Sequence, residues 1–322
     1  MHILVIGGAG YIGSHVVKAL LNRGMNVTVF DNLSTGTKIN LFDNADFIEG
    51  DILKYEQILF AMKQNVDGIV LLAGKKAVGE SMENPMKYAF NNINGVVNVL
   101  NAMVESGVNK AIFSSSAAVY GVPQYSPMDE EHPVNPMSFY GFTKHETERL
   151  LKWYDELKGI KFVSLRYFNA VGYDEQGDVK GLEENPQNLL PIVMEAAIGK
   201  RDKVKIFGND YETRDGTCIR DYIHVTDLGS AHALALELLE KGGASQILNL
   251  GTSQGSSVLE MITKTQEVIG RPVPYEFAPR RAGDPAVVTA KADKAREILG
   301  WEAQHSDLDN IIRSTWNVYN KQ

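Results

Sequence analysis

The sequence predicts an α/β fold, a doubly wound parallel sheet with a smaller mixed α/β lobe after it. Short apolar runs alternate with longer segments of helical periodicity through the first half of the chain, and strands joined by crossover helices form parallel sheets. The apolar runs are continuous, as in strands buried on both faces. The predicted strands cover residues 3–7, 26–30, 46–49, 67–73, 110–115 and 161–167, and the predicted helices cover 11–23, 55–63, 85–106 and 139–157.

The pattern loosens after Tyr167. Residues 168–190 carry scattered glycines and are predicted to be irregular, and long irregular segments in compact domains are usually functional. We predict a sheet domain over residues 1–167, to which the segment near 219–241 returns, and an interleaved lobe over 168–322. The remaining predicted elements are strands at 204–207 and 219–224, helices at 189–199 and 226–241, and an amphipathic helix after residue 306.

Composition narrows the class of partner. The 322 residues carry a formal charge of −8, which argues against nucleic acid or an anionic membrane as partner, because both favour a basic face. Cys218 is the only cysteine, so the chain can form no internal disulfide and a reducing compartment is expected. No stretch approaches the length of an apolar membrane span. We predict a soluble cytoplasmic protein with no metal site, since the histidines lack metal-ligand spacing, and we interpret Trp153 and Trp301 as packing residues.

A glycine-rich turn follows the first predicted strand and opens the first helix. Gly7, Gly10 and Gly13 are spaced three apart, and glycines there permit a tight turn and a close approach of the backbone to a pyrophosphate. The N-terminus of the following helix adds free N–H groups that favour an anion. The motif predicts a dinucleotide site on a sheet of the Rossmann type.

Two acidic residues end the next strands. Asp31 is placed to accept hydrogen bonds from the adenosine ribose and to repel a 2′-phosphate, so NAD is favoured over NADP. Asp51, with Ile52 beside it, is placed either to meet the adenine or to cap its own loop. Position alone leaves both interpretations open.

A candidate chemical centre lies at the fifth strand and the helix after it. Tyr140 and Lys144 are four residues apart and share a helical face. An ammonium near the phenol would stabilise the phenolate and lower its pKa, which suits a general acid/base. A hydroxyl from Ser114–Ser116 at the strand end could bond the same substrate oxygen. Such a pair alone is commonly a solvated helix pair; after a dinucleotide motif it predicts catalysis.

Longer blocks carry a family resemblance. They run from Phe30 to Gly36, from Lys76 to Ser81, from Phe113 to Gly121, from Arg166 to Gly172, and from Ile206 through Asp215 to Val225. With these blocks the chain resembles the extended short-chain dehydrogenase/reductases, and among them the UDP-hexose 4-epimerases. The resemblance implies an isomerase that interconverts UDP-glucose and UDP-galactose through a 4-keto sugar, with NAD staying bound. It also implies a homodimer that forms through the helices at 85–106 and 139–157.

The resemblance assigns roles to individual positions. Tyr140 would be the catalytic base, Lys144 would support it and hold the nicotinamide ribose, and Ser116 would assist proton transfer. The residues implied for NAD are Gly7, Gly10, Tyr11, Ile12, Gly13, Asp31, Asn32, Leu33, Ser34, Thr35, Gly36, Asp51, Ile52, Leu72, Ala73, Gly74, Lys76, Asn91, Tyr140, Lys144 and Phe168. Those implied for the sugar nucleotide are Ser116, Tyr140, Asn169, Asn188, Leu189, Lys205, Phe207, Arg220, Arg281, Asp284 and Val288.

Three positions qualify the resemblance. The family's His-x-Ala at the end of the fourth strand is Leu71-Leu72-Ala73 here, and Lys75 stands unusually beside Lys76. Val288 occupies a position where a tyrosine would restrict the sugar's 2-substituent, so UDP-N-acetylhexosamines are also expected as substrates.

Other functions remain open. Ala117 and Ala118 replace the acid/base pair of a dehydratase, so dehydration is disfavoured. A UDP-glucuronate epimerase or decarboxylase and a non-catalytic NAD-binding module are the alternatives. The intact Tyr140 and Lys144 pair disfavours the second.

Overall fold

The computed structural model describes residues 1–183, 186–281 and 283–321. Its centre is a seven-stranded parallel sheet in the order β11-β6-β5-β4-β1-β2-β3, which confirms the predicted fold class. The strands are β1 (His2–Ile6), β2 (Asn26–Asp31), β3 (Asp46–Glu49), β4 (Gly68–Leu71), β5 (Lys110–Ser116), β6 (Lys161–Tyr167) and β11 (Gln246–Leu250).

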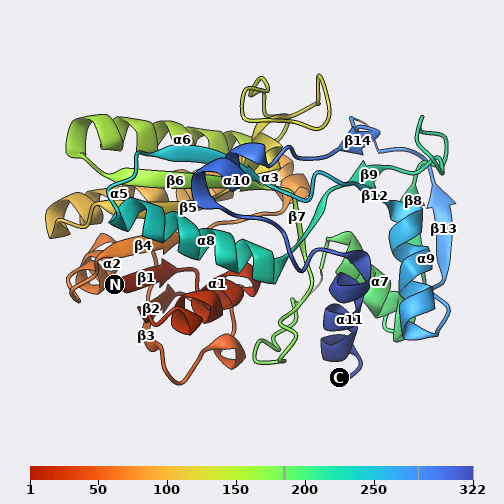
Figure 1. The fold of residues 1–322 in the computed structure, drawn as a ribbon, viewed down its shortest axis with the longest axis horizontal. Helices are drawn as coiled ribbons and strands as arrows, with labels where there is room; N and C mark the ends of the chain where they lie inside the picture. The colour runs from red at the N-terminus through yellow and green to blue at the C-terminus, as the bar shows by residue number, and fades with distance from the viewer. Residues whose placement is uncertain (184–185, 282, 322) are drawn as a thin grey trace.

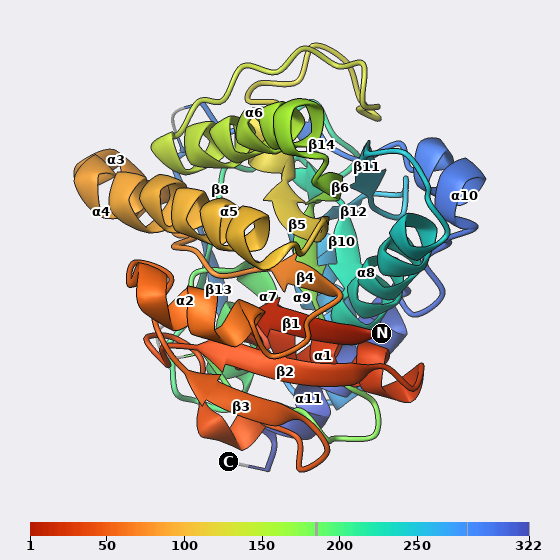
Figure 2. The same ribbon diagram turned by 90° about the vertical axis from the view of Figure 1, so that its left-hand side faces the viewer.

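Helices cover both faces of this sheet (Figures 1 and 2). Side chains alternate between the faces along each strand: Ile3 and Val5 of β1 join one buried cluster, and Leu4 and Ile6 join another. The first cluster is closed by α1 (Tyr11–Asn22) and α8 (Val225–Glu240), and the second by α2 (Tyr55–Met62), α5 (Gly95–Ser106) and α6 (Phe139–Lys158). Burial on both faces explains the continuous apolar runs.

The predicted helix over residues 85–106 is interrupted. It consists of α4 (Pro85–Ala89), a π-helical segment (Phe90–Asn94) and α5, and a further short helix, α3 (Val78–Glu83), precedes it. π segments occur often at functional sites. Here the π segment carries Asn91 and Asn92.

The predicted strand at 219–224 is two short strands in different sheets, β9 (Ile219–Arg220) and β10 (Tyr222–His224). The break falls at Asp221, whose buried carboxylate accepts the backbone N–H groups of Thr252, Ser253 and Ala290. A side chain that bonds the backbone of two separate segments fixes the chain direction there, and hydrophobic periodicity does not reveal such contacts.

One of the remaining helices, α10 (Asp293–Leu299), packs against β11 of the central sheet and against α8. The others form, with smaller sheets, a group on one side of the molecule (Figure 1). β7 (Asn169–Val171) lies in the stretch 168–190 that we predicted to be irregular, and it pairs with β10; residues 184 and 185 of that stretch lie outside the described residues. The other elements are α7 (Leu189–Ala197), β8 (Val204–Phe207), β12 (Ser256–Ser257), α9 (Val258–Ile269), β13 (Tyr275–Ala278), β14 (Val287–Val288) and α11 (Leu308–Tyr319).

The two tryptophans behave differently. Trp301 is buried and donates its indole N–H to the Asp227 carbonyl, as expected of a packing residue. The same interpretation of Trp153 is wrong, because its side chain on α6 is 55% exposed. None of the helices in the described ranges is long and apolar enough to cross a membrane.

Three buried histidines predict a loss of stability in mild acid. Burial lowers the pKa of His15 and of His232 to about 4 and that of His224 to about 3. Each is neutral in the folded chain and takes up a proton near pH 6.5 when unfolded, so stability falls as the pH drops below about 6.5. Urea unfolding at pH 7 and pH 5 measures this. We expect His232→Gln to remove about 2 kcal/mol of the difference between the two pH values, and an unchanged difference would contradict the assignment.

Candidate active site

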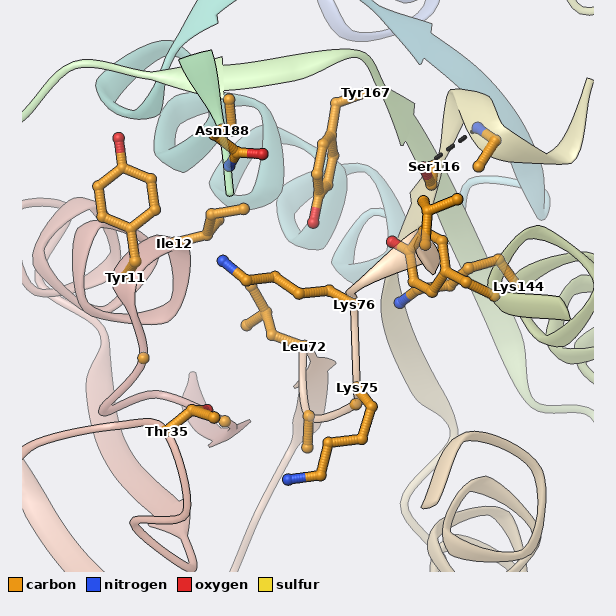
Figure 3. A pocket seen from close by; sticks show the side chains of 18 of the residues that line it. Tyr11, Ile12, Thr35, Leu72, Lys75, Lys76, Ser116, Lys144, Tyr167 and Asn188 are labelled. Atoms are coloured by element: carbon orange, nitrogen blue, oxygen red, sulfur yellow. Dashed lines mark hydrogen bonds between the residues drawn. The ribbon is translucent and has the colours of Figure 1, made fainter. Parts of the chain in front are cut away.

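A cavity of about 760 Å³ lies at the carboxyl ends of the central strands. The sheet order reverses between β1 and β4, and ligands of open α/β sheets bind at such a switch point. Loops from both lobes close the cavity, so its lining includes the glycine turn after β1 and Arg281 from the second lobe. Figure 3 shows Tyr11 and Ile12 on one side and Ser116 and Lys144 on the other.

The glycine turn fits a pyrophosphate. Gly7 has φ +90°, and a Cβ there would lie 2.6 Å from the Ala73 nitrogen. A Cβ on Gly13 would lie 2.1 Å from the Gly7 carbonyl oxygen, so both positions require glycine for close packing of turn, strand and helix. Gly10 caps α1 without a side chain that bonds the helix, which leaves the helix N–H groups available to an anion.

Asp31 ends β2 at the edge of this cavity and is itself 8% exposed. Its carboxylate accepts hydrogen bonds from the Ala9 N–H at 3.0 Å and the Leu33 N–H at 2.8 Å. Burial raises the pKa of Asp31, and these bonds together with the charge of Lys75 oppose the rise. Asp31 therefore ties the glycine turn to the loop after β2 and also lines the cavity.

The structure shows one of the two interpretations of Asp51, the loop cap, and the contact with the adenine stays a prediction. One carboxylate oxygen accepts the Leu53 N–H at 2.9 Å and so caps its loop. The other accepts the amide of Asn32 at 3.1 Å, and both residues line the cavity.

The chemical end joins β5, β6 and α6. Tyr140 lies in the first turn of α6 beside Ser116. Burial raises the pKa of Tyr140, and the hydrogen bond with Ser116 opposes that rise. The Lys144 ammonium donates to the Ser114 carbonyl at 2.8 Å and lies 5.8 Å from the centre of the Tyr140 ring. Burial lowers the pKa of Lys144 to about 8, although the charge of Glu148 opposes it.

The predicted lowering of the Tyr140 pKa by Lys144 does not hold in this structure, where the tyrosine pKa is raised. The reason is that desolvation dominates and the ammonium is directed to the Ser114 carbonyl. Stabilisation of the phenolate would need a further positive charge close to the ring.

A buried ion pair supports this end of the site. Glu148 lies one helical turn beyond Lys144 and accepts two hydrogen bonds from Arg166, at 2.9 and 2.6 Å. It also accepts the hydroxyl of Ser115 at 2.7 Å. Although burial opposes the charged carboxylate, these bonds hold the pKa of Glu148 at about 2. The pair fixes α6 to the strand ends that carry Ser116 and Tyr167.

The second lobe brings two arginines to the cavity. Arg220 forms an ion pair with Asp284 at 2.5 Å. The guanidinium of Arg281 lies 3.9 Å from the centre of the Phe207 ring. Asn188 caps α7 without bonding its N–H groups, and its side chain points into the site (Figure 3). Two guanidiniums and a free helix terminus suit a second pyrophosphate.

Most residues that the sequence assigned line this one cavity, although they come from eleven separate chain segments. Five do not: Leu33 and Leu189 pack against buried clusters, Gly36 lies against Ala9, Lys205 is exposed on β8, and the Phe207 ring contacts the Arg281 guanidinium.

Sequence reasoning missed other lining residues, notably Tyr167 and Glu183. Tyr167 pairs in register with Ser116 in the neighbouring parallel strand. Strand register could have predicted its place, because adjacent parallel strands end at one sheet edge. The chain has Leu71-Leu72-Ala73 where the family has His-x-Ala. Of these residues, Leu71 is buried in the core and Leu72 lines the cavity.

The fold and this cavity define a dinucleotide-dependent enzyme class, and comparison with known proteins specifies it. Residues 3–251 match the profile of the NAD dependent epimerase/dehydratase family. The chain belongs to this family, which confirms the predicted resemblance and the prediction of NAD.

Similar proteins are UDP-glucose 4-epimerases. That of Halalkalibacterium halodurans is 46% identical over 320 residues, which are 98% of this chain and 95% of the relative. The crystal structure of the Brucella ovis enzyme in complex with NAD has a TM-score of 0.97 and 43% identity, covering 99% of this chain and 98% of that one. The structure of the Bifidobacterium longum enzyme with NAD⁺ and UDP has a TM-score of 0.93 and 36% identity, covering 100% and 99%.

Proposed function

We propose that this chain interconverts UDP-glucose and UDP-galactose by inverting carbon 4 of the hexose. The observation that carries the proposal is the joint presence, in one cavity, of Tyr140, Lys144 and Ser116 at one end and two arginines at the other. The glycine turn between them supports a pyrophosphate site for NAD, because Gly7 and Gly13 have no room for a Cβ and bring the backbone close to the cavity. The similar proteins carry the same activity in their names.

Each residue of the site has its own role in the proposed reaction. Tyr140 takes the proton of the 4-hydroxyl as the C4–O bond becomes a carbonyl, and it returns that proton when the alcohol re-forms. Ser116 donates a hydrogen bond to the same oxygen, and Lys144 holds the nicotinamide ribose. Bound NAD supplies the hydride acceptor and donor for C4. Arg220 and Arg281 hold the pyrophosphate, so the hexose can turn between the two half-reactions.

The test is incubation of purified protein with UDP-galactose and no added cofactor. We expect UDP-glucose to form without net NADH, because each cycle regenerates the NAD that stays bound. Accumulation of NADH would contradict epimerisation and indicate a dehydrogenase.

We also propose that N-acetylated UDP-hexosamines are substrates. Val288 lines the cavity beside the apolar group that includes Phe168 and Val134, and its short side chain leaves room for a 2-substituent. Val288→Tyr is expected to lower kcat/KM for UDP-N-acetylgalactosamine at least about tenfold relative to UDP-galactose, since a filled pocket discriminates by about 1–3 kcal/mol. Val288→Ala is the control and keeps the wild-type ratio. Wild-type protein active on UDP-galactose alone would contradict this proposal.

A homodimer is part of the proposal. Exposed apolar side chains lie on the outer faces of α5 and α6: Val104 is 40% exposed, Trp153 55% and Leu157 65%. Apolar side chains gathered on one surface mark an interaction site, and these helices are the ones that the family resemblance assigns to the dimer. Light scattering should give about twice the 35.6 kDa chain mass; a monomer would contradict pairing.

We also propose a binding role for each lobe and a cellular location. Residues 1–167 would hold NAD and 168–322 the UDP-sugar, with the segment near 219–241 returning to the sheet domain; the packing of α8 against α1 supports this. A cytoplasmic location is supported by the single free cysteine, Cys218.

A further inference from the structure

Two adjacent lysines leave the end of β4 in different directions (Figure 3). Lys76 extends toward Ile12 and Asn188 and forms an ion pair with Glu183. Lys75 extends to the other side, and its ammonium lies 3.3 Å from the Ser34 hydroxyl. Among the residues that the structure describes, no carboxylate lies within ion-pair distance of Lys75. Its charge is therefore available to an anion in the cavity that it lines.

The main chain of Lys75 is held in place by a buried side chain. Asn92, 4% exposed, accepts the Lys75 N–H at 2.8 Å and donates to the Lys75 carbonyl at 2.9 Å. Asn92 also donates to Thr143 on α6 at 3.1 Å. The π segment that carries Asn92 thus clamps the loop after β4. A lysine on a clamped backbone loses less entropy when it binds than one on a mobile loop.

The Lys75 ammonium lies beside the loop after β2. An adenosine ribose would lie at this loop. Ser34 follows Asp31 by three residues, and the charge of Lys75 acts on the Asp31 carboxylate. Asp31 already accepts two backbone N–H groups, so part of its negative charge is compensated before any ligand binds. The exclusion of a 2′-phosphate by an acid at this position depends on charge repulsion. Here a nearby ammonium opposes that repulsion.

We propose that Lys75 is a specificity-determining residue of the dinucleotide site, whose ammonium accepts a 2′-phosphate on the adenosine ribose so that the chain binds NADP as well as NAD. The Ser34 hydroxyl supplies a second donor to the same phosphate. NAD remains the tighter ligand because Asp31 still faces the ribose hydroxyls. This inference rests on the cofactor site of the proposed function, and it revises the expectation that Asp31 alone decides against NADP.

The test incubates the full-length protein as purified with mixtures of NAD and NADP until exchange is complete, and the ratio of the two dinucleotides then released by acid gives their relative affinity. The wild-type chain is expected to prefer NAD by no more than about tenfold. Lys75→Leu should widen that preference by about 10- to 100-fold, almost entirely through weaker NADP binding, because a charge-assisted hydrogen bond contributes about 1.5–3 kcal/mol. Lys75→Arg should keep the wild-type ratio. Thermal shifts with each dinucleotide give an independent readout.

Lys241→Leu is the matched control, since it removes an exposed lysine outside the cavity and changes net charge equally. Its ratio of NAD to NADP affinity should equal that of the wild type. No detectable NADP binding by the wild type, or an unchanged ratio in Lys75→Leu, would overturn the inference and leave the proposed function intact. Failure of the wild type to bind either dinucleotide would instead overturn the proposed function.

Discussion

Tyr140→Phe is expected to lower kcat for UDP-galactose by about 10²- to 10⁴-fold, the usual contribution of a positioned acid/base. The variant keeps the ring and loses only the hydroxyl that we propose exchanges a proton with the 4-hydroxyl of the sugar. KM should change little, because the residues proposed to hold the pyrophosphate, Arg220 and Arg281, lie in another part of the cavity lining. Steady-state kinetics measures both constants, and the NAD released by acid shows whether the cofactor site is intact.

Tyr154→Phe is the matched control for this prediction. Tyr154 lies on the same helix, but its hydroxyl donates to Asn101 at 2.7 Å outside the cavity, so its kcat should stay within about twofold of the wild type. A loss of less than tenfold in Tyr140→Phe would show that another group moves the proton.

The central sheet and its motifs could be predicted because their signals are local. Six of its seven strands follow from apolar runs alone, and the glycine turn and the Tyr140-to-Lys144 spacing lie within single segments. The missed strand, β11, lies far along the chain and reaches the sheet by pairing with β6. Long-range pairing of this kind leaves no local period to detect.

Most residues of the site could be predicted from the sequence, but the directions of their pKa shifts could not. Sequence placed Tyr140 and Lys144 on one helical face, but the direction of the tyrosine pKa depends on burial from several segments. The sequence could not predict which part of the cavity each of Lys75 and Lys76 reaches. Lys76 is directed by its ion pair with Glu183, and the Lys75 backbone is held by Asn92 in the π segment. Such contacts join residues far apart in sequence, so they emerge only from the folded chain.

Glu148→Leu is expected to lower the free energy of unfolding by about 3–5 kcal/mol, because it leaves the Arg166 charge buried without its partner. The side chains of Glu148 and Arg166 are 1% and 5% exposed, so water cannot replace the lost carboxylate. Urea unfolding at pH 7 measures the loss. The double variant Glu148→Leu/Arg166→Met should recover most of it, since it removes both charges and fills the space with apolar atoms.

The same carboxylate predicts two dependences on pH. The pKa of Glu148 is about 2 in the folded chain and near its ordinary value when unfolded. The contribution of Glu148 to the free energy of unfolding is therefore complete above about pH 4.5 and is lost as the pH falls toward 2. The difference in that free energy between wild type and Glu148→Gln should narrow in acid.

Because the charge of Glu148 also raises the pKa of Lys144, Glu148→Gln should move the alkaline limb of kcat to lower pH. A purely structural role would lower stability without moving that limb, so an unshifted limb would contradict the electrostatic part of the argument.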